Sequence, residues 1–238
     1  MNKLLKNEFP QHIAKTALQE LTITHFEGEV IIIDHPTQIK EAADYLNQHT
    51  ILGVDTEARP SFKRGVHYPT ALLQIATTER CYLIRLTHVG MPAEIATIFA
   101  NPNICKVGLA FKDDINGLRR RRDFKPVNCV DLQSIVCKYG IMDLGLQKIF
   151  AINFGKKISK SQQLTNWENS QLTPDQARYA ATDAWATLTI YLRLLQTKPL
   201  SRKEVEALKL LEKEAQIQRQ QAALERKMKE AEQSKVQP

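Results

Sequence analysis

The 238-residue sequence has no apolar run that approaches the roughly 20 residues of a membrane-spanning helix. Its opening residues, MNKLLKNEFPQHIAK, lack the apolar core of a secretory signal peptide. Neither an internal repeat nor a second globular domain is visible in the pattern of apolar residues. We therefore expect one intracellular, cytoplasmic protein domain with no membrane partner.

Cysteine is also scarce. The four cysteines, none of them in a CxxC pair, lie in apolar stretches and are Cys81, Cys105, Cys129 and Cys137. This spacing favours buried free thiols over a disulfide or a zinc site.

Acidic residues are outnumbered, because 33 lysines and arginines face 26 aspartates and glutamates, for a formal charge of +7. An excess of positive charge suits an anionic partner such as nucleic acid. Four consecutive arginines, Arg119 to Arg122, can hold a polyanion. They can equally be the solvated end of a helix, and the charge pattern leaves both interpretations open.

The apolar pattern predicts an α/β protein with a mixed central sheet and helices on its faces. We expect strands within EVIIID, ILGVDTE, TALLQIAT, CYLIRL and ICKVGLAF, the third and fourth of which form a hairpin across a short turn. Helices are expected over Gln11–Leu21, over PAEIATIFA, from DDINGLRRR onward, over VDLQSIVCKYG and LGLQKIF, and after Pro36, with Ile39, Ala42, Ala43 and Leu46 on one face.

Two further helices complete the expected organisation. Thr173 as N-cap, Pro174 at the first position and Gln176 three residues after the cap predict a long helix over Pro174–Leu195. Beyond Pro199 the sequence is rich in both charges, and we expect a helical tail that docks through Val205, Leu208 and Leu211 and frays afterwards. The domain limits are thus a helical extension (1–24), a main domain (25–198) and a charged helical tail (199–238).

Acidic residues stand at three places where they can meet. Asp55 and Glu57 end a buried strand and, being two residues apart, point to the same side, where one carboxylate would normally take up a proton. Asp113 and Asp114 follow another strand at a helix start, where a plain N-cap is the alternative. Tyr179 and Asp183 lie one turn apart on the long helix. The alternative interpretation of this spacing is an ordinary hydrogen-bonded pair on the protein surface. If the three places converge at one edge of the sheet, bound Mg²⁺ would neutralise the carboxylates.

The stretches VDTE, KVGLAFKDD and YAATDAWATLTIY resemble, in order and spacing, the three motifs of the DEDDy-type 3′-5′ exonuclease domain of the DnaQ-like superfamily. With the loop KSQQLTNW, the chain is most similar to the Werner-type exonuclease and ribonuclease D group over residues 25–196. The resemblance implies a ribonuclease H-like fold, with a mixed central β-sheet flanked by α-helices. It also implies hydrolysis of nucleic acid from a free 3′ end with two Mg²⁺ or Mn²⁺ ions per site.

The resemblance further implies roles for individual residues. Asp55, Glu57 and Asp183 would bind the first ion, and Asp55 would bridge to a second ion held by Asp114, six residues after Gly108. Tyr179 would orient the attacking water, since its ordinary pKa near 10 makes it a poor base. Glu57 would also touch the 3′ hydroxyl of the substrate.

Three residues of the loop before the last motif are candidates for substrate binding: Lys160, Ser161 and Trp167. Lys160 would meet a phosphate and Trp167 would stack on a base, although a tryptophan in a polar loop is more often a packing anchor. His67 can approach the substrate, but a plain turn histidine is the better interpretation.

We expect an active metal-dependent 3′-5′ exonuclease. The alternatives are a catalytically inactive nucleic-acid-binding module of the same fold, and an endonuclease or phosphodiesterase that uses the same metal chemistry. The sequence leaves DNA and RNA open as substrates, because no residue is identifiable that reads a 2′ hydroxyl.

Overall fold

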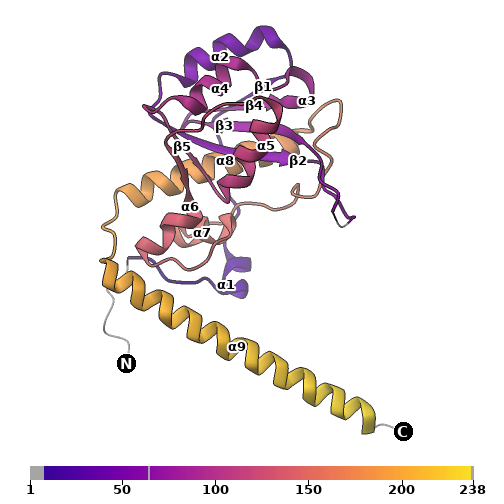
Figure 1. Cartoon of the computed structure of the whole chain (residues 1–238), viewed down its shortest axis with the longest axis vertical. Coiled ribbons are helices and arrows are strands. Elements are labelled where there is room, and N and C mark those ends of the chain that lie inside the picture. Colours follow the sequence, from indigo (N-terminus) through magenta and orange to yellow (C-terminus); the bar gives the residue numbers. More distant parts are fainter. Residues whose placement is uncertain (1–7, 64, 237–238) are drawn as a thin grey trace.

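A six-stranded mixed sheet organises the chain in the computed structural model, which describes residues 8–63 and 65–236 (Figure 1). The strands follow the order β1-β4-β3-β2-β5-β6, with bounds β1 Glu29–Ile33, β2 Ile51–Ala58, β3 Thr70–Ala76, β4 Arg80–Arg85, β5 Cys105–Gly108 and β6 Cys129–Asp131. The β2–β3 and β3–β4 pairs are antiparallel, and the other three are parallel. The predicted α/β class, mixed sheet and β3–β4 hairpin are confirmed.

One face of the sheet is covered by short helices. They are α2 Ile39–Leu46, α4 Ala93–Ala100 and α5 Phe111–Arg121, with the 3-10 turn η1 Pro36–Gln38 before α2 and α3 Leu86–Val89 after β4. Helix α2 buries the four residues that its apolar spacing predicted. These helices and the underlying strands form one apolar cluster, centred on residues such as Leu52, Leu73 and Phe99.

The long helix α8, Pro174–Leu195, crosses the opposite face and contacts strands β1 to β5 (Figure 1). Its start is as predicted, because the Gln176 amide donates to Thr173 Oγ1 and the Thr173 amide donates to the Gln176 side chain. Gly53 of β2 lies directly beneath it, where a Cβ atom would stand 2.1 Å from the carbonyl oxygen of Ala184. Strand β2 and helix α8 are therefore packed backbone against backbone.

A second apolar cluster lies where α8 meets α7 Leu146–Phe154, α6 Leu132–Ile135 and the 3-10 turn η2 Val136–Tyr139. We predicted only helix over VDLQSIVCKYG, and this is wrong at its start, because the edge strand β6 comes first. Asp131 ends this strand and accepts the amide of Gln133 as the N-cap of α6. Three residues of strand are too short to show an alternating pattern.

The N-terminal helix is shorter than predicted, since α1 spans Lys15–Glu20 and not Gln11–Leu21. The backbone before it forms hydrogen bonds with residues 142 and 143. The Met142 amide donates to the Gln11 carbonyl (2.8 Å), and the Ile13 amide donates to Asp143 Oδ2 (2.9 Å). These bonds replace the first helical turn. Residues 1–7 of the predicted extension lie outside the described part.

The charged tail forms one continuous helix, α9 Arg202–Val236, which leaves the rest of the fold (Figure 1). Leu208 is buried and Val205 is half-buried, but Leu211 is 57% exposed, so the predicted docking through Leu211 and the predicted fraying are both wrong. The tail docks by Leu208, as predicted, and by a hydrogen bond between His12 Nε2 and Glu212 Oε2 (2.9 Å). Across the described residues, we find no helix that joins the length and the apolar surface a membrane crossing requires.

The cysteines are free, as predicted, but only two of them are buried. Cys81 and Cys105 lie in central strands, whereas Cys129 is exposed and Cys137 is half-buried. Cys129 is exposed because β6 is the edge of the sheet.

Candidate active site

Three acidic side chains meet where β2 runs under α8. Asp55, Glu57 and Asp183 each place one carboxylate oxygen within 4.8 Å of those of the other two. Asp55 and Glu57 share one side of β2, as strand alternation predicts, and Asp183 reaches them from the middle of α8. The close contact at Gly53 brings these two elements within reach of each other.

Asp114, on the first turn of α5, is not one of the three acids that meet, although its charge acts on Asp55 and Glu57. Its Oδ1 accepts a hydrogen bond from Thr56 Oγ1 at 2.5 Å, while the neighbouring Asp113 is exposed. The alternative of a plain N-cap is wrong for both, because Ala110 occupies the cap position in a left-handed conformation. The carboxylate of Asp131 accepts the amides of Ala110 and Phe111 in their place.

Tyr179 stands one turn before Asp183 on α8. Both side chains are buried, so the surface-pair interpretation is wrong. The Tyr179 ring packs against Trp167, with ring centroids 6.0 Å apart. Trp167 is only 1% exposed and belongs to the core, so it is a packing anchor and offers no free face to a base.

Burial shifts the acid–base behaviour of the whole cluster. Desolvation, followed by the charges of Asp183 and Asp114, raises the pKa of Glu57 to about 9. Desolvation likewise raises the pKa of Asp183 to about 7, even though Tyr179 and the Lys160 charge act to lower it. Burial and the three neighbouring carboxylates hold the pKa of Asp55 well above its usual value. The metal-free cluster therefore retains protons near neutral pH.

Burial also raises the pKa values of Asp114 and Tyr179. Burial raises the pKa of Asp114 to about 7, against the hydrogen bond from Thr56, which lowers it. Burial and the charges of Asp183 and Glu57 raise the pKa of Tyr179 above its ordinary value of 10. The phenol therefore stays neutral and suits an orienting role better than that of a base.

The cluster opens into a cleft of about 300 Å³. Beyond the acids, the cleft is lined by Thr56, Leu109, Gly145, Leu146, Gln147, Ile158, Ser159, Lys160, Gln163 and Tyr179. Of the predicted substrate contacts, Lys160 lines this cleft, while Ser161 lines a neighbouring pocket. His67 is exposed in the loop after β2 and is not among the described residues that line the cleft.

Two of the four consecutive arginines, Arg121 and Arg122, stabilise the fold through hydrogen bonds to backbone carbonyls. Arg121 donates to the carbonyls of Thr70 and Leu86, and Arg122 donates to that of Met91. Arg119 pairs with Asp123 just beyond the end of α5, and Arg120 is exposed. Two of the four arginines are thus engaged by backbone carbonyls, and a role of the run in holding a polyanion stays a prediction.

The sequence prediction missed Thr56 and Asp131. Thr56 lies between the two acids of β2, and its hydroxyl donates to the carboxylate of Asp114. Asp131 holds the start of α5, which carries Asp114. Their only signals in the sequence are the place of Thr56 within VDTE and that of Asp131 before a short helix.

The donors of this site suit a hard divalent cation. They are carboxylate oxygens only, gathered within one ligand sphere and in a poorly solvated place, which is the chemistry that Mg²⁺ and Mn²⁺ prefer. An ion there would also relieve the mutual repulsion that keeps the cluster protonated. The residues therefore fit a metal centre.

Comparison with known proteins gives consistent matches. Residues 30–197 match a family model described as 3′-5′ exonuclease. The chain is 30% identical over 159 residues to the bifunctional 3′-5′ exonuclease/ATP-dependent helicase WRN of Mus musculus, covering 63% of this chain and 11% of that protein. It is 31% identical over 185 residues to exonuclease 3′-5′ domain-containing protein 2 of Mus musculus, covering 71% of this chain and 28% of the relative.

Solved structures share the fold. The crystal structure of Escherichia coli RNase D, described as an exoribonuclease involved in structured RNA processing, superposes with a TM-score of 0.65 at 23% identity. The match covers 75% of this chain and 46% of that one. The mixed six-stranded sheet with its flanking helices is the ribonuclease H-like fold of these exonucleases.

Proposed function

Because the chain belongs to the 3′-5′ exonuclease family, we propose that it hydrolyses phosphodiester bonds of nucleic acid from a free 3′ end. The observation that carries this proposal is the convergence of Asp55, Glu57 and Asp183 in one cleft within the matched region. The chain spans about a tenth and about a quarter of the lengths of the two curated relatives above. The activities of those whole proteins are therefore not assigned to this chain.

The acids would hold two divalent ions, Mg²⁺ or Mn²⁺. We assign Asp55, Glu57 and Asp183 to one ion, and Asp55 with Asp114 to the other. When bound, such ions supply the charge that ionises an attacking water and stabilises the leaving oxygen of an in-line displacement. The hydrogen bond from Thr56 would keep Asp114 turned toward this site.

Other side chains would bind and orient the substrate. Tyr179 is held by Trp167 at the edge of the cleft, where its neutral hydroxyl would orient the attacking water. Lys160 lines the same cleft and would contact the phosphate of the scissile bond. Glu57 would touch the 3′ hydroxyl, which would favour chain ends over internal bonds.

The net charge of +7 supports an anionic polymer as substrate. Whether the polymer is DNA or RNA is decided by contacts to the 2′ position. The similar fold of RNase D adds RNA as a candidate beside DNA. We further assign the exonuclease domain to residues 25–198, which include the matched region, with 1–24 and 199–238 as extensions.

A catalytically inactive nucleic-acid-binding module of the same fold is the second candidate. The four carboxylates and Tyr179 are all present, whereas loss of one ligand would suffice for inactivity. This favours the enzyme.

The experiment uses 5′-labelled single-stranded and 3′-recessed oligonucleotides of DNA and RNA, with Mg²⁺, Mn²⁺ or EDTA. We expect a ladder that shortens from the 3′ end and disappears in EDTA and in Asp55→Ala, because that change removes the ligand shared by both ions. Binding without a ladder would support the inactive module. Cutting of a closed circle would indicate an endonuclease.

A further inference from the structure

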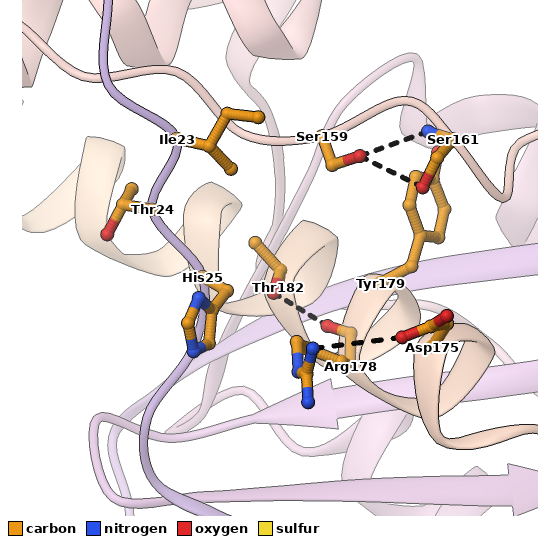
Figure 2. Close-up of a pocket in the computed structure, with 9 residues that line it drawn as sticks. All are labelled: Ile23, Thr24, His25, Ser159, Ser161, Asp175, Arg178, Tyr179 and Thr182. Atoms are coloured by element: carbon orange, nitrogen blue, oxygen red, sulfur yellow. Dashed lines mark hydrogen bonds and ion pairs between the residues drawn. The ribbon is translucent and has the colours of Figure 1, made fainter.

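A second pocket adjoins the cleft on the other side of the 159–161 segment. It measures about 240 Å³ and is lined by Ile23, Thr24, His25, Ser159, Ser161, Asp175, Arg178, Tyr179 and Thr182. Figure 2 shows the N-terminal segment with His25 on one side, the two serines across from it and the α8 residues along the floor. Tyr179 and Ser159 line both this pocket and the cleft, so the two hollows are neighbours.

The wall of this pocket is a fixed part of the fold. The Thr24 amide donates to the Lys157 carbonyl, and the Lys157 amide donates to the Thr22 carbonyl, each at 2.9 Å. The Phe26 amide donates to Thr182 Oγ1 at 3.1 Å. Residues 22–26 are thereby tied both to the loop that carries Lys160 and to α8.

The pocket offers donors to an anion. Arg178 lies on its α8 side, and its ion pair with Asp175 is long, at 3.7 Å, with the arginine side chain 57% exposed. Such a surface pair is weak, so the guanidinium keeps donors for a phosphate, which it can bind in a bidentate manner. His25 and the hydroxyls of Ser159 and Ser161 add polar groups around it. The pocket is somewhat smaller than the roughly 300 Å³ at which whole small-molecule sites begin, which suits one sugar–phosphate unit of a polymer.

We propose that this pocket binds the sugar–phosphate of a second nucleotide of the strand being degraded, with Arg178 on its phosphate. The inference rests on the proposed function and extends it, because it makes residues 22–26 part of the substrate site. The strand would then contact the enzyme on both sides of the 159–161 segment.

The test compares two substrates, a labelled 12-mer and the p-nitrophenyl ester of thymidine 5′-monophosphate, which has one nucleotide and fills only the cleft. For Arg178→Gln we expect KM for the 12-mer to rise about tenfold with little change in kcat, as for loss of one charged hydrogen bond. Hydrolysis of the ester should be unchanged. Arg202→Gln on the exposed start of α9 serves as the matched control.

An equal loss on both substrates would overturn the inference, because Arg178 would then act through the fold or through Tyr179. No change on either substrate would overturn it as well. If the parent protein cleaves neither substrate, it is the exonuclease proposal that fails. The pocket is then judged by fluorescence anisotropy of the 12-mer in Ca²⁺, where an unchanged Kd for Arg178→Gln refutes it.

A different observation concerns Gln74, in the middle of β3. Its side chain is fully buried, yet neither its Nε2 nor its Oε1 has a hydrogen-bond partner among the described residues. Buried polar groups are nearly always paired, and an unpaired one destabilises a fold. The unpaired amide makes Gln74 a candidate for a functional role.

The strand register places Gln74 next to the acids. It is directly opposite Asp55 in the antiparallel β2–β3 pair, so both side chains project to the same face of the sheet. Leu72 and Ala76, two residues to either side, pack in one cluster with Ala184 of α8. The Gln74 amide therefore lies between the sheet and α8, beside a proposed metal ligand.

The geometry points to Gln74 as a positioning residue, whose Nε2 would donate to the carboxylate of Asp55 once a metal ion orients that carboxylate. Hydrogen-bond partners of metal ligands orient the ligand, and their loss typically weakens metal binding by about 10–100-fold. This role would account for an amide that has no partner of its own.

Gln74→Leu tests it, because leucine has a similar size and no amide. We expect two opposite effects: an unchanged or higher melting temperature in EDTA, and Mn²⁺ binding about tenfold weaker or more by calorimetry. Ile75→Leu, on the opposite side of the same strand, is the control. Unchanged Mn²⁺ affinity would overturn the inference, and so would a melting temperature that falls together with the affinity, since the amide would then support the fold.

Discussion

Replacing Asp183 by asparagine should stabilise the metal-free protein, and more so at high pH. The ordinary pKa of this carboxyl is 3.8, and burial raises it to about 7 in the folded protein. Because the folded state binds the proton more tightly than the unfolded chain, the carboxyl favours folding below pH 4. That contribution is lost as the pH rises toward 7.

The size of the effect follows from the two pKa values. At 1.36 kcal/mol for each pKa unit, the contribution of the Asp183 carboxyl to folding stability has fallen by about 1.6 kcal/mol at pH 5 and by about 4 kcal/mol at pH 8. Asparagine carries no charge at either pH. Since neighbouring acids share protons with Asp183, we expect the stabilisation by Asp183→Asn to be about 2 kcal/mol larger at pH 8 than at pH 5. For a chain of this length that is about 4–8 °C in melting temperature.

Thermal unfolding of parent and Asp183→Asn, in metal-free buffers at pH 5 and pH 8, measures this difference. Asp123→Asn is the control, because that side chain is 87% exposed and, among the described residues, forms an ion pair only with Arg119 near the end of α5. Added Mn²⁺ should stabilise the parent and not the Asp183 variant. A stabilisation that is equal at the two pH values, or larger at pH 5, would refute the electrostatic reasoning.

Three further predictions concern other parts of the structure. Asp114→Ala should slow cleavage at least a hundredfold, about 2.7 kcal/mol, whereas Asp113→Ala should cost only about 0.3–1 kcal/mol of helix stability; reversed rates in a ladder assay would move the ligand to Asp113. Gly53→Ala should force β2 and α8 apart at Ala184, lowering both the melting temperature and Mn²⁺ affinity; an intact affinity by calorimetry would show that the site tolerates the separation. Removal of the chain from Gln216 onward should leave folding and cleavage largely unchanged, because the buried contact at Leu208 precedes the cut; a changed mass by light scattering would reveal a partner helix.

Local signals explain which elements could be predicted. The buried face of α2 and the capped start of α8 depend on residues within one or two turns, so their spacing alone indicates them. Strand β6 and residues 11–13 form their hydrogen bonds with segments far away in the sequence. No pattern within a short window contains that information.

The residues of the candidate site also divide into those that local patterns predict and those that depend on distant contacts. Alternation along β2 and helical spacing on α8 were enough to pair Asp55 with Glu57, and Tyr179 with Asp183. The burial of Trp167 in the core and the placing of Ser161 outside the cleft depend on how one loop lies across α8. Loop paths of this kind follow from tertiary packing, which a single sequence does not display.

The position of Asp183 late in the chain has a consequence for synthesis of the protein. The acids of β2 are made early, while α8 is made after every strand of the sheet. Long-range contacts of this kind form late, because a large loop must first close. During translation, the unfinished chain would therefore hold Asp55 and Glu57 without their third partner. A nuclease assembled in this order would acquire activity only after α8 has left the ribosome and docked.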